Sequence, residues 1–171
     1  MPASTARRIG VLTALDGADG PAVAVGDPAA HHVRLRPDGL QPTLGSGAAG
    51  ASVPAAPVPW DRVRSVAVDL PTTWWPHPAI ADTVVPVIEG ILGGSSGGIA
   101  ETPTFPVRVA VDDGSLIEWR VTPHYLSGYR RRDAALARRF VEHLVARPDA
   151  RVLLARPDDL LARLGEILHK T

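Results

Sequence analysis

The sequence predicts an α+β fold in which an antiparallel barrel of short strands is closed by a helix near the C-terminus. Short segments in which apolar and polar residues alternate recur along the chain, and this period is typical of half-buried strands. Tight-turn sequences join two pairs of these segments, Pro-Asp-Gly at 37–39 and Asp-Asp-Gly at 112–114. A long amphipathic segment, 130–146, then follows the second pair and predicts the closing helix.

The strands are predicted from local alternation. Val33 and Leu35 alternate with arginines, and Gly39 is expected to supply a positive φ in the turn that follows. In the second hairpin, the odd-numbered residues of 117–121 form the apolar face. The predicted strands cover residues 9–15, 22–25, 32–36, 40–44, 63–70, 107–111 and 115–122, with a last short strand at Tyr125–Leu126.

Two helices are predicted near the C-terminus. In residues 130–146, Leu136, Phe140 and Leu144 recur every four residues and are expected to plug the barrel. Arg147-Pro-Asp ends this helix. Residues 157–169 begin with proline and two acids, which suit the first turn and the positive end of a helix.

The segment 71–105 interrupts the strand pattern and is interpreted as an insertion. Its residues 79–92 are predicted to be helical from the spacing of apolar side chains, although Pro86 and Gly90 weaken that helix. Residues 93–104 and the earlier stretch 45–57 are rich in glycine, serine, alanine and proline and predict loops. We therefore expect one domain over residues 1–150 and a helical extension over residues 151–171.

Composition excludes several functional classes. Basic and acidic residues balance at 18 each, so the chain lacks the positive excess that drives general nucleic-acid binding. The absence of cysteine excludes disulfides and thiolate chemistry. No targeting or transmembrane segment is recognised, which predicts a cytoplasmic protein, and the preference for arginine over lysine favours a GC-rich bacterial source.

The order of these elements resembles the pleckstrin-homology-like domains of bacteria, of the actinobacterial type. The resemblance is carried by the hairpin at 32–44, the Val58-to-Val63 entry to a strand, the hairpin at 107–121 and the helix at 130–145. It implies a bent antiparallel barrel plugged by one C-terminal helix. The family's lipid-binding members carry a basic cluster in the first hairpin, where this chain has only Arg34 and Arg36, so lipid binding does not follow from the resemblance.

Three sequence patterns resemble functional motifs but are better explained as loops or as surface residues. Gly-x-Gly-x-x-Gly at 45–50 is followed by three prolines, where a dinucleotide site needs a helix. Gly-x-Ser-x-Gly at 94–98 lacks the flanking strand and helix of a nucleophile elbow, although His124 or His143 could in principle act as a base, with Asp112 or Asp113 as its orienting carboxylate. The six histidines do not show metal-ligand spacing. No catalytic residue, cofactor or metal is therefore predicted.

Two surfaces are candidates for binding. Trp74 and Trp75 are adjacent in the sequence, which is unusual for a loop. They are expected either to contact a partner or to cover the barrel edge. The apolar side chains of the insertion give the first candidate, a protein-contact surface made of Trp74, Trp75, Ile80, Val84, Ile88 and Ile91. The basic residues give the second, an anionic-ligand surface made of Arg34, Arg36, Arg130, Arg131 and Arg132.

The basic run also has a simpler interpretation, in which it is a solvated helix flank and Arg138 pairs with Glu142 four residues later. The function we expect is a non-catalytic binding or assembly module that recognises a protein partner or itself. A peripheral phospholipid-binding domain is the alternative, and a small serine hydrolase is a second alternative that the missing elbow disfavours.

Overall fold

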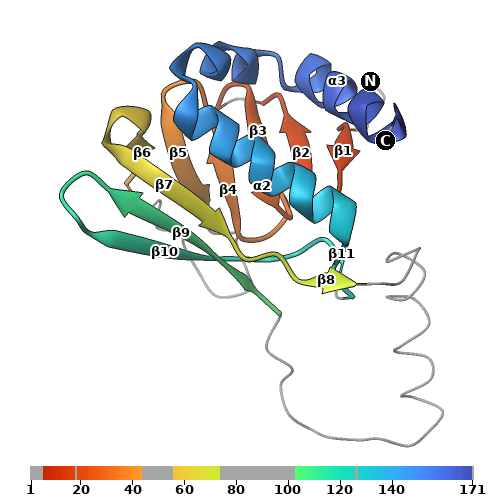
Figure 1. Cartoon of the computed structure of the whole chain (residues 1–171), viewed down its shortest axis with the longest axis horizontal. Coiled ribbons are helices and arrows are strands. Elements are labelled where there is room, and N and C mark those ends of the chain that lie inside the picture. The colour runs from red at the N-terminus through yellow and green to blue at the C-terminus, as the bar shows by residue number, and fades with distance from the viewer. Residues whose placement is uncertain (1–5, 18, 44–55, 74–102, 126, 171) are drawn as a thin grey trace, which may run out of the picture.

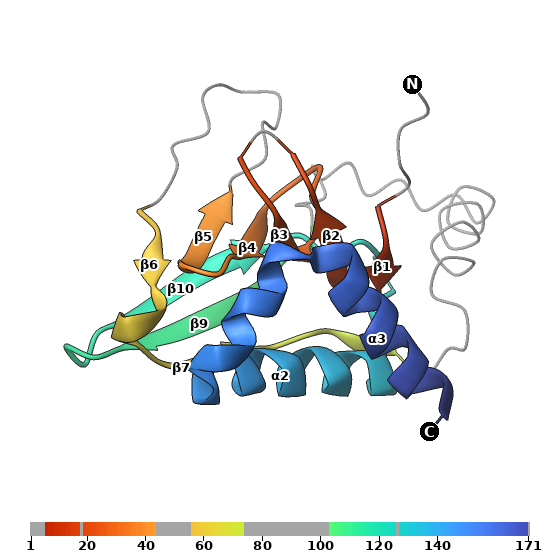
Figure 2. The same ribbon diagram turned by 90° about the horizontal axis from the view of Figure 1, so that it is seen from above.

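Two antiparallel sheets, a short parallel pair of strands and a layer of helices form the described part of the computed structural model (Figures 1 and 2). The structure describes residues 6–17, 19–43, 56–73, 103–125 and 127–170. Six strands form the first sheet in chain order: β1 (Arg8–Ile9), β2 (Leu12–Leu15), β3 (Ala22–Gly26), β4 (His32–Leu35), β5 (Gly39–Thr43) and β6 (Val58–Pro59). The second sheet has the order β10 (Leu116–Val121), β9 (Phe105–Val111) and β7 (Val63–Val68).

The first sheet is a meander in which each strand pairs with the next one. The predicted segment 9–15 is divided in two, because Gly10 takes a φ of +55° and turns the chain between β1 and β2. The predicted tight hairpin after β4 is present and has a two-residue turn, in which Arg36 and Gly39 exchange backbone hydrogen bonds of 2.9 and 3.3 Å. Gly39 does not have the expected positive φ; it is needed because a side chain there would collide with the Val58 carbonyl of β6.

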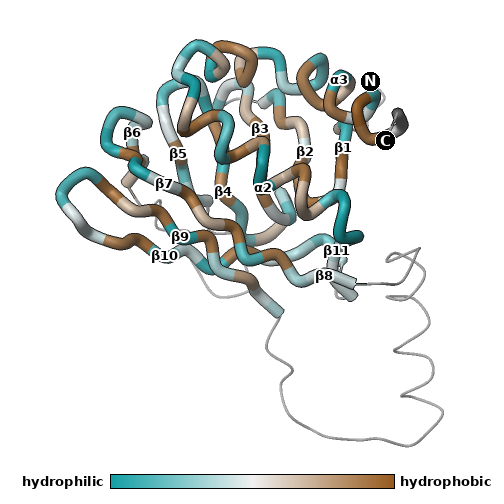
Figure 3. The backbone as a smooth tube through the Cα atoms, viewed as in Figure 1, coloured by the Kyte–Doolittle hydropathy of each residue, from teal (hydrophilic) through white to brown (hydrophobic). Residues whose placement is uncertain are grey.

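The second sheet shows the predicted alternation along each strand (Figure 3). Val107, Val109 and Val111 are buried on the inner face of β9. On the outer face, Arg108 binds the carboxylates of Asp69 and Glu118, which lie on either side of it. The predicted hairpin at 112–114 is confirmed, and Gly114 has a φ of +82° there.

Helix α2 (Arg131–Ala146) packs along β7 and closes the space between the two sheets (Figure 2). Phe140, Val141 and Leu144 are buried in the common core, as are two alanines, 134 and 137. The expectation for Leu136 is wrong, since this residue is only half-buried. An i, i+4 row drifts about 40° per step around a helix, so the small residues at 134 and 137 face the sheet instead.

A 3₁₀ segment that the sequence did not predict, η2 (Pro148–Ala155), follows α2 directly. Its Arg151 donates to the carbonyl oxygens of Leu144 and Val145, at 2.9 and 3.1 Å, and so satisfies acceptors at the last turn of α2. The same guanidinium lies 5.0 Å from the ring centroid of Trp60, which is buried and donates its indole N–H to the Arg36 carbonyl at 2.7 Å.

The final helix, α3 (Pro157–Lys170), confirms the predicted one and contacts β1 and β2 of the same chain. Leu160 and Leu161 are buried in the same core as α2. A last short strand was expected at Tyr125–Leu126; Tyr125 is not in a strand, and Leu126 lies outside the described residues. The last strand described is β11 (Tyr129–Arg130), which pairs in parallel with β8 (Thr72–Thr73).

Residues 74–102 lie outside the described part of the chain, and the predicted helix at 79–92 and linker at 93–98 fall there. Most of the predicted loop at 45–57 also does. In the residues that are described, no helix is long and apolar enough to cross a membrane.

Candidate functional site

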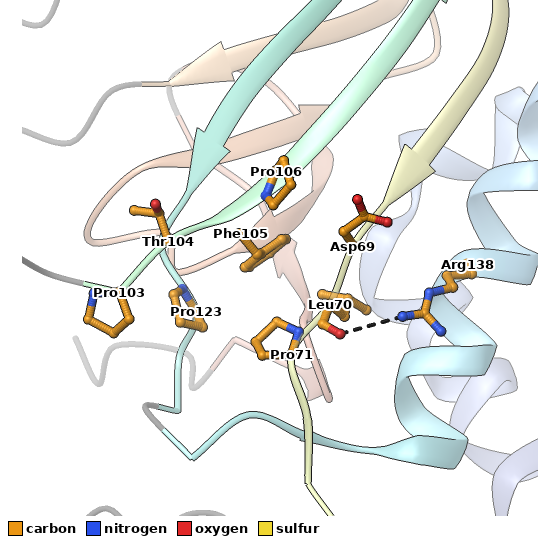
Figure 4. A pocket seen from close by; sticks show the side chains of 9 residues that line it. All are labelled: Asp69, Leu70, Pro71, Pro103, Thr104, Phe105, Pro106, Pro123 and Arg138. Atoms are coloured by element: carbon orange, nitrogen blue, oxygen red, sulfur yellow. Dashed lines mark hydrogen bonds between the residues drawn. The ribbon is translucent and has the colours of Figure 1, made fainter.

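The residues predicted to make the protein-contact surface, Trp74 to Ile91, lie outside the described residues. Residues on both sides of the segment 74–102 are described, and they come together at one place. Pro71, just before β8, and Pro103, just before β9, both line a hollow of about 430 Å³ (Figure 4). This hollow, which we call the proline pocket, is the candidate functional site.

Four separate parts of the chain supply the proline pocket. Asp69 and Leu70 follow the end of β7, and the turn after β10 gives a further proline. Helix α2 contributes Arg138, whose guanidinium reaches the pocket edge in Figure 4. The complete lining is Asp69, Leu70, Pro71, Pro103, Thr104, Phe105, Pro106, Pro123 and Arg138.

The chemistry of the proline pocket is mainly apolar. Proline has no backbone N–H, so four of the nine lining residues offer no main-chain donor to a ligand. Arg138 is the only cation of the lining, and it already donates to the carbonyl oxygens of Val68 and Leu70, at 3.1 and 3.4 Å. The expected pair with Glu142 is thus replaced by bonds to β7. A site of this kind suits an apolar side chain better than a phosphate.

The arginines of the first hairpin bind the chain itself. Arg34 has a side chain only 8 % exposed, and it binds the Asp19 carboxylate at 2.7 Å and the Gly20 carbonyl at 2.9 Å. Arg36 binds the Asp19 carbonyl at 2.8 Å and the Asp38 carboxylate at 3.2 Å. An anionic ligand at this place would have to compete with these contacts.

The second part of the predicted anionic surface is the run of arginines where α2 begins. Arg130 is half-buried at the end of β11, whereas Arg131 and Arg132 are exposed in the first turn of α2. Arg132 lies 3.7 Å from the Asp133 carboxylate. This run and the Arg34–Arg36 pair stand on different elements and bind different parts of the chain.

A buried polar cluster links the two sheets, and its central residue is His124. The imidazole Nε2 lies 3.1 Å from the Thr13 hydroxyl of β2, and Nδ1 lies 3.8 Å from the Asp27 carboxylate. The His124 backbone N–H donates to the Tyr129 hydroxyl at 2.8 Å. The imidazole is 2 % exposed and Thr13 is 1 % exposed.

Burial decides the electrostatics of this cluster. Desolvation lowers the pKa of His124 to about 4, and the positive charge of Arg8 acts in the same direction, against the effect of Asp27. Desolvation also lowers the pKa of His32 and raises that of Tyr129. A hydroxyl, an imidazole and a carboxylate in line resemble a nucleophilic triad, but this hydroxyl is closed off from solvent. The cluster is therefore placed to join the sheets.

The other residues considered for catalysis are held apart. Arg62 binds Asp112 at 3.2 Å and Asp113 at 2.6 Å, which fixes the β9–β10 turn to the start of β7. The carboxylates proposed to orient a histidine are thus engaged by an arginine. Ser96 and the glycine motif at 45–50 lie outside the described residues. Within the described residues, no three His, Asp or Glu side chains gather as they would around a metal ion.

The proline pocket and the His124 cluster were not predicted from the sequence. The pocket had one available signal, because prolines stand next to the ends of three predicted strands. The contact between Thr13 and His124 joins residues 111 positions apart and follows no local pattern.

Comparison of the chain with models of protein families, with curated proteins and with solved structures finds no match. The interpretation of the pocket and the cluster rests on their own chemistry.

Proposed function

We propose that this protein is a non-catalytic binding or assembly module that recognises a protein partner or itself. The proline pocket carries the proposal. It is a hollow lined mainly by apolar side chains with few free donors, and residues on both sides of the segment that contains Trp74 and Trp75 line it. Apolar pockets ringed by a few polar groups are the usual anchor sites for side chains of a partner.

The proposed architecture is a pleckstrin-homology-like barrel. Its support is the strand order: four strands, β2 to β5, pair in sequence, three more form the second sheet, and α2 then packs on β7. Folds of this kind host many functions, so the function is argued from the pocket alone.

The ligand chemistry can be tested directly with two small probes. N-acetyl-tryptophan amide, added to ¹⁵N-labelled protein, is expected to shift the amide resonances of Leu70, Thr104 and Phe105. O-phosphoserine should leave them unchanged, because the Arg138 guanidinium is occupied by backbone carbonyls. Thr104→Arg, at the exposed rim, should abolish the indole-induced shifts, whereas Thr104→Ser should keep them. Shifts with phosphoserine alone would contradict the proposal.

The predicted contact surface has a separate test. Trp74→Ala and Trp75→Ala are expected to weaken partner capture or self-association. Unchanged behaviour in both assays would remove these two residues from the contact surface but leave the pocket result standing.

The alternative is recognition of an anionic phospholipid surface, and the exposed Arg131 and Arg132 at the start of α2 favour it. Sedimentation with phosphatidylserine vesicles at two salt concentrations separates the two functions. Binding driven by charge should weaken with salt, and an Arg131→Ala, Arg132→Ala double variant should lose it.

A further inference from the structure

The outer edge of β10 presents unpaired backbone groups. Hydrogen-bonded residue pairs alternate along two antiparallel strands. The Val111 N–H donates to the Ser115 carbonyl at 3.0 Å, and the same register continues along both strands. The odd-numbered residues of β10 therefore bond to β9. Leu116, Glu118 and Arg120 point their N–H and C=O groups away from β9.

The neighbours of this edge support that assignment. Opposite Arg120 stands Pro106, which has no N–H and whose carbonyl accepts a hydrogen bond from the Asp69 N–H, just after β7, on the other side. Further along the same edge, Thr122 donates to the His31 carbonyl at 2.8 Å and accepts from the Asp27 N–H at 2.9 Å. The outward-pointing backbone N–H and C=O groups along this edge thus form hydrogen bonds where another segment of the fold lies beside them.

The three remaining positions have no such partner within the described residues. Among the described residues, nothing accepts from or donates to their outward backbone groups, and Leu116 is 65 % exposed. The opposite edge of the sheet is covered, because Arg138 of α2 bonds to carbonyl oxygens of Val68 and Leu70. Figure 1 shows β10 outermost in the sheet, with the tip of its hairpin projecting from the body of the protein.

We propose that a second copy of this chain pairs with the β10 edge in antiparallel orientation, forming one six-stranded sheet across two molecules. This inference rests on the proposed role as a binding module and names one partner. Two-fold pairing of identical edges is self-complementary, since each strand offers the donors and acceptors that the other lacks.

The register follows from the space available. Because the Asp27–His31 turn fills the position beside Thr122, the strand of the second copy must end before that point. Pairing Glu118 with Glu118 of the second copy meets this condition and gives six hydrogen bonds. The hairpin turn at Gly114 of the second copy then lies beside Thr122, where its chain curves away toward its own β9.

Other registers are less favourable. A shift that set Glu118 opposite Arg120 of the second copy would improve the charges, but it would drive Leu116 of that copy into the Asp27–His31 turn. The opposite shift leaves only four hydrogen bonds.

Side chains on both faces fit the chosen register. On the inner face, half-buried Ile117 comes opposite Trp119 of the second copy, and aromatic with β-branched pairs stabilise sheets. On the outer face, Leu116 is covered by the aliphatic stem of Arg120 of the second copy. Each Glu118 is held by Arg108 at 2.9 Å and Arg120 at 3.3 Å, so four guanidinium groups flank the two facing carboxylates. The interface is short, and the dimer should be weak and concentration-dependent.

Because the chain contains no cysteine, the register can be read by introducing single ones. Opposed residues of a hydrogen-bonded pair lie about 5.5 Å apart at Cα, which is within the range of a disulfide. With diamide as oxidant, Glu118→Cys should cross-link to itself at least about tenfold faster than Leu116→Cys or Arg120→Cys. A mixture of the latter two should cross-link to each other, and Arg132→Cys, on exposed α2, is the control for random collision.

Sedimentation velocity over a range of concentrations tests the reversible dimer. Arg120→Pro removes an outward N–H without removing a bond to β9, so this variant should stay monomeric, whereas Arg120→Ala should still dimerise. A wild-type chain that stays monomeric at the highest concentration, with Glu118→Cys no faster than Arg132→Cys, would overturn the inference. Indole binding by Arg120→Pro reports on the proline pocket separately, so the two proposals can fail independently.

Discussion

Acidification is expected to destabilise this fold through His124, because its imidazole is buried in the neutral form between the two sheets. Burial lowers the pKa of His124 from the ordinary 6.5 to about 4. The unfolded chain therefore takes up the proton first as the pH falls. The stabilisation of the folded state that comes from this difference in pKa is complete above pH 6.5. It is lost progressively as the pH falls toward 4. At about 1.4 kcal/mol for each pKa unit, the loss amounts to about 3 kcal/mol.

The groups around His124 account for the lowering of its pKa. Arg8 and His32 oppose a positive charge on the ring, and Asp27, at 3.8 Å from Nδ1, favours it. Desolvation is the largest of these effects, and the lowered pKa of His32 adds to the loss in the same pH range.

Urea unfolding at about pH 7 and about pH 4.5 measures the effect as a change in the free energy of unfolding. His124→Gln, whose amide can still reach Thr13, should be less stable than the wild type near neutral pH but should lose much less stability on acidification. His143→Gln, on the exposed face of α2, should keep the wild-type dependence. An acid-induced loss as large in His124→Gln as in the wild type would refute this account.

Further predictions concern the same junction and the two hairpins. Tyr129→Phe leaves the buried His124 N–H without its acceptor and should cost about 1–3 kcal/mol in urea unfolding. Tyr125→Phe removes a hydroxyl that has no such role and should cost little. Gly26→Ala should cost more than about 3 kcal/mol, because φ is +104° and the new methyl would collide with the neighbouring strand. Gly114→Ala, with φ of +82° but open space around it, should cost only about 1 kcal/mol, and equal losses in these two variants would contradict the packing described.

The sequence predicted what local periodicity encodes. The strands around Val33 and Val109 and the helices near Phe140 and Leu161 were correct, because burial on one face imposes a period of two or 3.6 on the residues themselves. The 3₁₀ segment at 148–155 was missed because irregular turns with a short apolar run have no such period.

The candidate sites were harder to predict from the sequence, for a different reason. The proline pocket is assembled from four parts of the chain, and Thr13 meets His124 only because the two sheets are folded against each other. Likewise, the position of Arg34 beside a turn suggested a free side chain, but its partner Asp19 comes from the connection between β2 and β3. Contacts between distant segments leave no spacing pattern by which a single sequence could reveal them.

Pro71 and Pro103 flank the segment 74–102 and line one pocket, so the described residues on its two sides lie close together. The entropy of closing a loop grows only with the logarithm of its length. Replacing residues 74–102 by a linker of about six residues should therefore lower the free-energy cost of loop closure by only about 1.4 kcal/mol. We therefore expect that segments of very different length can be exchanged at this position without changing the rest of the fold.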